Sequence, residues 1–316
     1  MSRRQLLADA ALLAVVIIWG TTFVLIQNAV RDFPTFPLLA LRFWTATAAF
    51  APILLYRRWR GVTGPAPSAR PRTWRQHILP PLWIGLALTA GYYFQTQGLL
   101  FTTPAKSGFI TGLSVVLVPI GAALFFRQRI EPPAIAGVAL ATAGLALLSL
   151  NATMAVNFGD LLTLICAVAF AAHILLVGKY APDFSPWTLG AGQILVAALA
   201  STLLALLTWP AGGLPPITSN VVLAVLISGL LGTAFAFTVQ SAAQRFTAAT
   251  HTALIFSLEP VAAGVSSYLL IGEVLTRRAL LGCALIFAGT LTAEFWRVVR
   301  WRGRRPAAAA GALQTD

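Results

Sequence analysis

The sequence has few charged residues, few acids and only two cysteines. Charged residues make up 10% of its 316 positions, against roughly a quarter in soluble domains, so a water-soluble globular protein is excluded. Cys166 and Cys283 both lie inside apolar runs, which gives neither a disulfide framework nor the ligand spacing of a metal site. We predict that both are small buried side chains.

Motifs of common enzyme chemistries are also missing. The sequence contains no glycine-rich phosphate loop followed by Lys and Ser or Thr, no His-Glu-x-x-His pair, no clustered aspartates and no nucleophile elbow. ATP hydrolysis and metal-dependent hydrolysis are therefore not expected. The sequence predicts no enzymatic activity, no cofactor and no bound metal.

Long apolar stretches dominate what is present, since 58% of the residues are hydrophobic and the mean hydropathy is +0.81. A helix of about 20 residues spans a bilayer, and lipid cannot satisfy the backbone of any open structure. We predict an all-α integral membrane protein with ten transmembrane helices. The ten apolar stretches cover residues 7–30, 36–56, 78–100, 106–126, 132–150, 158–179, 187–209, 219–240, 247–271 and 277–296.

The distribution of positive charge predicts the orientation. With a cytoplasmic N-terminus, 17 of the 22 Lys and Arg residues fall in cytoplasmic segments, four in external loops, and Arg42 within a span. Basic residues collect in cytoplasmic loops, so both termini are predicted to be cytoplasmic. The apolar stretch from Leu6 to Val30 exceeds the core of a signal peptide and is interpreted as the first span. The net charge of +13 is attributed to topology, and no nucleic-acid partner is expected.

An internal repeat divides the chain. Displacement by 151 residues aligns Asp9 with Asp160, Trp19 with Phe170, Asp32-Phe33 with Asp183-Phe184, and Arg42 with Gln193. Further along, Phe101–Ala105 is similar to Arg245–Ala249, Pro119 to Pro260, and Gly137/Gly144 to Gly282/Gly289. We predict a first five-helix repeat at 1–150, a second at 151–296, and a basic disordered tail at 297–316 that contacts anionic lipid headgroups. Five is an odd number, so the second repeat has inverted topology, as in many transporters.

The chain resembles the drug/metabolite transporter superfamily, in particular the EamA-type ten-helix group, over residues 8–296. The residues that carry the resemblance are Trp19-Gly20-Thr21-Thr22-Phe23, Leu41-Arg42-Phe43, Gly108–Leu113 with Pro119, Gln193, Thr247-Ala248-Ala249, Leu258-Glu259-Pro260-Val261, Gly272-Glu273, and Gly282 through Gly289.

The resemblance implies a basket-like bundle with a substrate path between the two halves. It also implies a secondary carrier, often one that exports amino acids or related metabolites. The sequence departs from internal symmetry at one point, because Gln128 stands nine residues before Gly137 where Glu273 stands nine before Gly282. The acid of the first half is instead Glu131, so the two acids do not occupy equivalent positions.

Two ionisable residues are candidates for proton coupling. Glu259 lies near the middle of the ninth predicted span, where an ionised side chain costs a few kcal/mol. It is interpreted either as a proton-coupling or substrate-ammonium site, or as an acid paired with a neighbouring helix near Pro260. Histidine can gain or lose a proton near neutral pH. His251 is therefore interpreted either as a proton-coupling residue or as a hydrogen-bonded packing residue.

Arg42 lies about two turns into the second span. Its guanidinium is suited to hold a substrate carboxylate through two parallel hydrogen bonds. The alternatives are that it extends to the membrane surface or pairs with Asp32 or Glu259.

Further polar and aromatic residues inside predicted spans are candidates for the lining of a substrate cavity. They either border a wet cavity or join helices by hydrogen bonds. On the third span, Tyr92 and Gln95 share one face and Tyr93 and Gln97 another, and the sequence does not distinguish the two. The remaining candidates are Trp19, Thr22, Thr111, Gln193, Phe237, Gln240 and Gln244.

The sequence thus predicts a monomeric, multi-pass secondary transporter of the bacterial inner membrane. It would export small polar or amphiphilic metabolites, with amino acids favoured, by alternating access. Multidrug, sugar or nucleotide-precursor transport on the same fold remains an alternative. Outside transport, the alternatives are a lipid-modifying membrane enzyme and a channel, but deep ionisable residues are too few for the first and the spans too apolar for an open pore.

Overall fold

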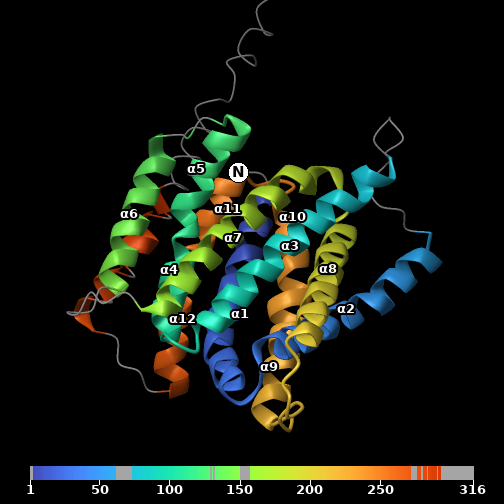
Figure 1. The fold of residues 1–316 in the computed structure, drawn as a ribbon. Helices are drawn as coiled ribbons and strands as arrows, with labels where there is room; N and C mark the ends of the chain where they lie inside the picture. Colours follow the sequence, from blue (N-terminus) through green and yellow to red (C-terminus); the bar gives the residue numbers. More distant parts are fainter. Residues whose placement is uncertain are drawn as a thin grey trace, which may run out of the picture.

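The computed structural model describes residues 3–61, 73–128, 130, 132–149 and 157–271, and most residues between 276 and 292. All regular structure in these segments is helical, and the helices form one bundle (Figure 1). The predicted tail at 297–316 and the acids Glu131 and Glu273 lie outside the described residues.

The helices follow the predicted spans closely. In the first half they are α1 (Arg3–Asp32), α2 (Thr35–Trp59), α3 (Trp74–Gly98), α4 (Pro104–Gly112), α5 (Ser114–Phe126) and α6 (Pro132–Ser149). In the second half they are α7 (Phe158–Tyr180), α8 (Pro186–Leu207), α9 (Ser219–Gly229), α10 (Ala236–Ala243), α11 (Ala249–Phe256) and α12 (Glu259–Ile271). A 3₁₀ turn, η1 (Ala181–Asp183), follows α7, and a π-helical segment, η2 (Leu230–Phe235), joins α9 to α10. The described residues between 277 and 292 are also helical.

Six helical segments are long and apolar enough to cross a membrane: Gln5–Asp32, Thr35–Trp59, Phe158–Asp183, Pro186–Leu207, Ser219–Ala243 and Ala249–Leu270. Shorter apolar helices cover Ile110–Phe126, Ile135–Gly144 and Leu280–Gly289. The predicted all-helical membrane architecture is therefore confirmed.

Two predicted spans are interrupted near their middle. Span 106–126 is divided at Leu113 into α4 and α5, and span 247–271 is divided at Ser257 and Leu258 into α11 and α12. Proline cannot donate a backbone hydrogen bond and crowds the preceding turn. Pro260 at the start of α12 has this effect at the second break, whereas Pro119 lies inside α5, after the first break. Glu259 therefore lies at a helix start and not in mid-helix.

Equivalent helices of the two halves begin at residues that are separated by one of two displacements. The pairs of first residues are Thr35 and Pro186, displaced by 151, and Trp74 and Ser219, Pro104 and Ala249, and Ser114 and Glu259, each displaced by 145. The displacement falls by six residues after α2, because α2 is three residues longer than α8 and the connection from α2 to α3 is three residues longer than that from α8 to α9. It also corrects two matches made from sequence, since Pro119 is equivalent to Gly264 and not to Pro260, and Phe101 is equivalent to Phe246 and not to Arg245.

The flank formed by α6 and the helical residues between 277 and 292 depends on glycine (Figure 1). A Cβ on Gly144 would lie 2.5 Å from the carbonyl oxygen of Gly282, and one on Gly289 would lie 2.6 Å from that of Gly137. These crossed contacts mean that the two helices run antiparallel where they meet. The predicted close approach of these glycines is thus seen at two equivalent points.

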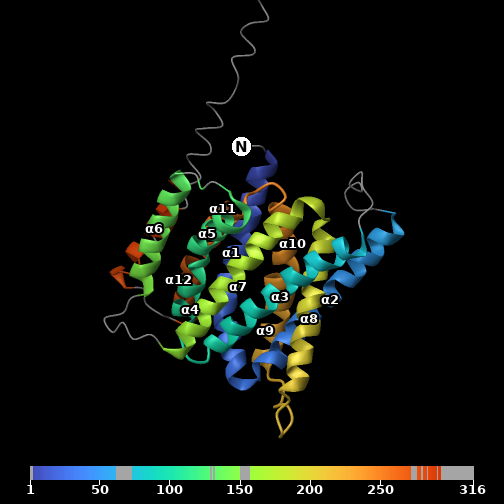
Figure 2. The same cartoon turned by 45° about the horizontal axis from the view of Figure 1, so that its top comes forward.

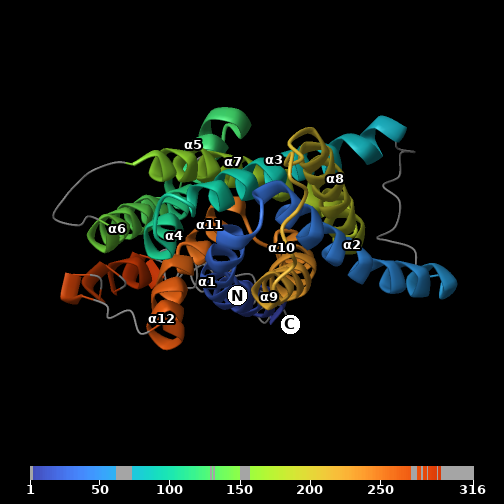
Figure 3. The ribbon, with the colours of Figure 1, turned by 60° about the horizontal axis from the view of Figure 1, so that its bottom comes forward.

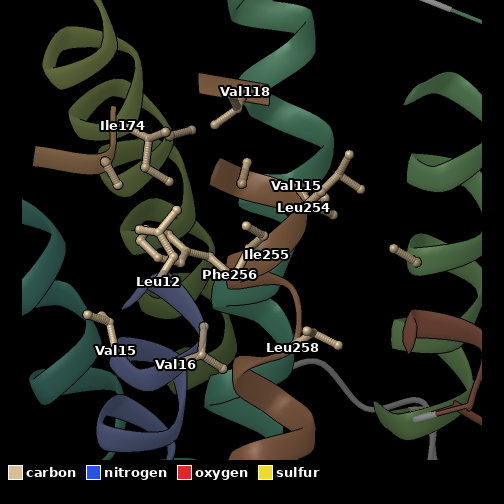
Figure 4. Close-up of a cluster of buried hydrophobic side chains, with 14 of the residues drawn as sticks. Leu12, Val15, Val16, Val115, Val118, Ile174, Leu254, Ile255, Phe256 and Leu258 are labelled. Carbon is tan, nitrogen blue, oxygen red and sulfur yellow. The ribbon is translucent and has the colours of Figure 1, made fainter. Parts of the chain in front are cut away.

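The first helix of each half packs against the other half. α1 contacts α9, α10, α11 and α12, while α7 contacts α3, α4 and α5. Figures 2 and 3 show α7 beside α3 and α5, and Figure 3 shows α1 beside α9 and α12. Figure 4 shows the resulting core, where Leu12 and Val15 of α1 meet Val115, Ile174 and Phe256 from three other helices. The two halves are therefore interlocked and do not stand side by side.

Candidate functional site

A cavity lies in the middle of the bundle. About 610 Å³ of space in and around it, including open solvent at its mouth, is not filled by any atom. Its lining comes from both halves: Trp19, Thr22, Phe23, Ile26, Arg42, Tyr92, Gln95, Leu99, Thr111, Ser114, Phe170, His173, Ile174, Phe237, Gln240, Phe256 and Glu259.

Most of this lining consists of residues at equivalent positions of the two halves. The displacements of 151 and 145 found for the helix starts relate seven pairs of lining residues. The pairs are Trp19 and Phe170, Thr22 and His173, Phe23 and Ile174, Tyr92 and Phe237, Gln95 and Gln240, Thr111 and Phe256, and Ser114 and Glu259. Only Ile26, Arg42 and Leu99 line the cavity without their equivalents. The cavity thus lies where the two repeats meet.

Aromatic rings form the apolar part of the wall. The ring of Trp19 lies 5.5 Å from that of Phe237 and 4.8 Å from that of Phe256. The ring of Tyr92 lies 5.3 Å from that of Phe170. Tilted and edge-on contacts at these distances stabilise aromatic clusters beyond area burial. They give the cavity a rigid wall suited to an apolar or amphiphilic solute.

The π-helical segment η2 positions Arg42. A π turn interrupts the regular α-helical hydrogen bonding and is frequent at functional sites. In η2 the carbonyl of Gly232 accepts from Trp19 Nε1 at 2.8 Å and from Arg42 Nη2 at 3.5 Å. Arg42 Nε donates to Thr233 Oγ1 at 2.8 Å, and the guanidinium lies 4.0 Å from the centre of the Tyr92 ring.

The charge of Arg42 is not neutralised by a side chain. Arg42 is 2% exposed, and its hydrogen-bond partners Thr233 and Gly232 are uncharged. Among the described residues, no carboxylate lies within salt-bridge distance of it, so the alternative pairing with Asp32 or Glu259 is not observed. A buried charge without a counter-ion is energetically costly.

Glu259 brings the opposite charge to the same cavity. It occupies the first turn of α12, where the unpaired backbone N–H groups and the helix dipole favour a carboxylate. Within the part of the chain that the structure describes, no cation forms an ion pair with it. The cavity wall therefore carries one guanidinium and one carboxyl group, on α2 and α12.

Two hydrogen-bond chains include residues of the cavity lining. His173 Nε2 lies 2.7 Å from Gln193 Oε1, and Gln193 Nε2 donates to Ser241 Oγ at 3.3 Å. Gln240 Nε2 donates to Gln244 Oε1 at 3.0 Å, and Gln244 Nε2 donates to the carbonyl of Ile174 at 3.0 Å. These chains tie α7, α8 and α10 together.

The structure brings together nine of the fourteen side chains that the sequence proposed for the site. Those in the lining are Trp19, Thr22, Arg42, Tyr92, Gln95, Thr111, Phe237, Gln240 and Glu259. On α3 it is thus the Tyr92 and Gln95 face that borders the cavity.

The other five lie behind or away from the wall. Tyr93 stacks on Phe36 at 4.4 Å, and Gln97 accepts a hydrogen bond from Thr35 at 2.8 Å. Gln193 and Gln244 belong to the chains described above. His251 joins α11 to α1 through a 2.8 Å contact between its Nε2 and Asp9 Oδ1. These five connect helices.

Several lining residues are absent from the list of site candidates made from the sequence. Phe170, His173, Ser114 and Phe256 are the most informative of them. A signal for them existed, because each is the repeat equivalent of a residue named from sequence or of Glu259. Applying both displacements to the candidate list identifies all four.

Comparison with known proteins relates the chain to one family. The model of the EamA-like transporter family matches residues 6–150 and 157–293. A protein of Archaeoglobus fulgidus named an uncharacterized transporter is 31% identical over 288 residues, which is 91% of this chain and 86% of that protein. A protein of Salmonella typhimurium named a probable amino-acid metabolite efflux pump is 27% identical over 95% of this chain and 97% of its own length. A solved crystal structure superposes with a TM-score of 0.71 at 22% identity, covering 92% of this chain and 98% of that one.

Proposed function

This chain belongs to the EamA-like transporter family, and from that membership and the central cavity we propose that it exports small amphiphilic metabolites, amino acids above all, as a secondary active transporter. The coarser description is plain: it is a multi-pass membrane transporter of the drug/metabolite type and not an enzyme. The proposal adds the substrate class, the direction and the mechanism.

The observation that carries the proposal is the repeat-related cavity. Seven pairs of equivalent residues from the two halves line one cavity. If the halves have opposite topology, as an odd number of spans in each requires, each end of this cavity is built from equivalent elements. Two similar packings can then expose it to either side of the membrane, which is the basis of alternating access in inverted repeats.

The topology is part of the proposal. Ten spans follow from the six long apolar helices, the three shorter ones and α3, which has 25 residues. The antiparallel contact of α6 with the helical residues between 277 and 292 supports opposite orientation of the repeats. We place both termini in the cytoplasm, and the monomer in the inner membrane of a bacterial cell.

The charges of the cavity support a zwitterionic substrate. Arg42 is suited to a carboxylate and Glu259 to an ammonium group, while Trp19, Tyr92 and Phe237 offer an apolar wall. An α-amino acid with an apolar side chain presents these three features together. The relative named as an amino-acid metabolite efflux pump supports the same substrate class and direction.

Counterflow in proteoliposomes tests the proposal. Purified protein is reconstituted with a saturating unlabelled amino acid inside, and accumulation of a labelled amino acid is followed for a panel of side chains, with protein-free liposomes as the control. We expect saturable accumulation, strongest for apolar side chains. Absence of saturable flux for every amino acid would contradict the substrate class, and conductance steps in planar bilayers would contradict a carrier.

A further inference from the structure

Gln240 differs from its repeat equivalent Gln95 in one respect that bears on the ligand. Both line the cavity. Gln95 Nε2 donates to Thr111 Oγ1 at 3.2 Å within its own half. The equivalent of Thr111 is Phe256, which cannot accept, so Gln240 instead donates to Gln244 at 3.0 Å.

The chain from Ile174 to Gln240 has a fixed direction. A backbone carbonyl only accepts hydrogen bonds, so the group of Gln244 that meets the carbonyl of Ile174 must be its amide NH₂. The oxygen of Gln244 then faces Gln240, so Gln240 must donate a hydrogen bond to it from its own NH₂ group. This orientation follows from the contacts alone, whereas Thr111 both donates and accepts and leaves Gln95 free to turn.

The oxygen at the end of the chain has no partner. Gln240 is 1% exposed, and its Oε1 is buried without a hydrogen bond. Leaving a buried acceptor unpaired is unfavourable, so a hydrogen-bond donor for this oxygen is expected. The open space beside Gln240 is the cavity that it lines.

We propose that Gln240 Oε1 is a substrate contact that accepts a hydrogen bond from a protonated amine, and that Gln244 is the positioning residue that holds it in this orientation. The proposal rests on the proposed function, because it takes the cavity as the substrate site. With Glu259, it gives the cavity two acceptors for an ammonium group, while Arg42 provides the donors.

The structure offers a matched set of variants. Gln240→Leu removes the acceptor. Gln244→Leu removes the fixed orientation, and leucine is the residue at the equivalent position of the first half, Leu99. Gln97→Leu is the control, since it makes the same change on a glutamine that joins α2 to α3 outside the lining.

Binding of two probes to the purified full-length protein separates recognition from packing. The probes are 2-phenylethylamine, a protonated amine, and 3-phenylpropanoate, a carboxylate of similar size, measured by titration calorimetry. We expect Gln240→Leu to weaken the affinity for the amine by about tenfold or more, as for the loss of a hydrogen bond to a charged group. The affinity for the carboxylate should change by less than about twofold. Gln244→Leu should reduce the preference for the amine, and Gln97→Leu should change neither affinity.

Three results would overturn the proposal: unchanged amine affinity in Gln240→Leu, equal weakening of both probes, or no amine binding by the wild-type protein. None of these depends on flux. A failure of this contact is therefore distinguishable from a failure of amino-acid transport, which the counterflow assay measures separately.

Discussion

Glu259 and Arg42 are the residues at which the cavity departs most from the symmetry of its two halves. Ser114 stands at the position equivalent to Glu259. Gln193, equivalent to Arg42, lies behind the wall and contacts His173. Each charge is therefore contributed by one half alone, so its role can be tested by one substitution.

Replacing Glu259 tests proton coupling. Glu259→Gln keeps the shape of the side chain and removes its ability to exchange a proton, so we expect transport driven by a pH gradient to be abolished. Exchange at equal pH on both sides should persist. Uptake measured across a range of pH checks this, with chromatography of the variant showing that it remains folded. Wild-type dependence on pH in this variant would remove Glu259 from the mechanism.

Replacing Arg42 tests recognition of a carboxylate. Loss of a charge-assisted hydrogen bond costs about 1.5–3 kcal/mol, so Arg42→Ala should raise the KM for an amino acid by about 10- to 100-fold. Arg42→Lys, which keeps the charge without the planar fork, should be intermediate. Wild-type transport by Arg42→Ala would dismiss the carboxylate role.

At the scale of helices, the contact of α6 with the helical residues between 277 and 292 is limited by glycine. A side chain at Gly144 would meet the backbone carbonyl of Gly282 at 2.5 Å, and backbone cannot yield as a flexible side chain can. Gly144→Val should therefore destabilise the protein by about 1–3 kcal/mol, the usual effect of overpacking.

Thermal unfolding in detergent measures this effect. Gly212→Val is the control, because no atom lies within 4 Å of the position where its Cβ would be. An unchanged melting temperature in Gly144→Val would show that this helix contact is not maintained in the membrane protein.

For the whole molecule, the sidedness of two exposed loops decides the topology. With both termini inside, Arg60 after α2 is cytoplasmic and Gly212 between α8 and α9 is external. In a protein whose native cysteines are replaced, Arg60→Cys should react with an impermeant thiol reagent only in inverted vesicles, and Gly212→Cys only in whole cells. Labelling of both from the same side would contradict the proposed arrangement.

Two contacts between the halves provide a test of alternating access. Asp9 of α1 meets His251 of α11 at 2.8 Å, and Thr102, before α4, donates to Asp160 of α7 at 2.9 Å. These contacts join equivalent helices at opposite ends of the bundle.

Cross-linking can fix either end. We expect that paired cysteines at Asp9 and His251, once oxidised, will stop counterflow, and that a reductant will restore it. A pair at Thr102 and Asp160 should behave in the same way. Full counterflow by the oxidised proteins would rule out motion at these contacts, and the single cysteine variants are the controls.

The sequence alone determined that the protein lies in a membrane, that it is helical, and which residues form much of the cavity lining. Apolar stretches of bilayer length must be helices because lipid offers the backbone no hydrogen bonds, and polar side chains in them are few enough to be candidates individually. That reasoning selected Arg42, Glu259 and the polar residues of α3, but it did not distinguish the two faces of α3. It failed for Tyr93 and Gln97, since a polar residue that joins two helices has the same sequence signal as one that borders a cavity.

Only the tertiary structure decided how the halves meet and which atoms remain unpaired. The interlocking of α1 and α7 with the opposite halves, and the direction of the Gln240 chain, depend on contacts between residues as far apart as Ile174 and Gln244. The hydropathy of each helix, a property of its own sequence, determines that the helix lies in the membrane. The pairing of side chains depends on which helix faces share a space, and packing between helices determines that.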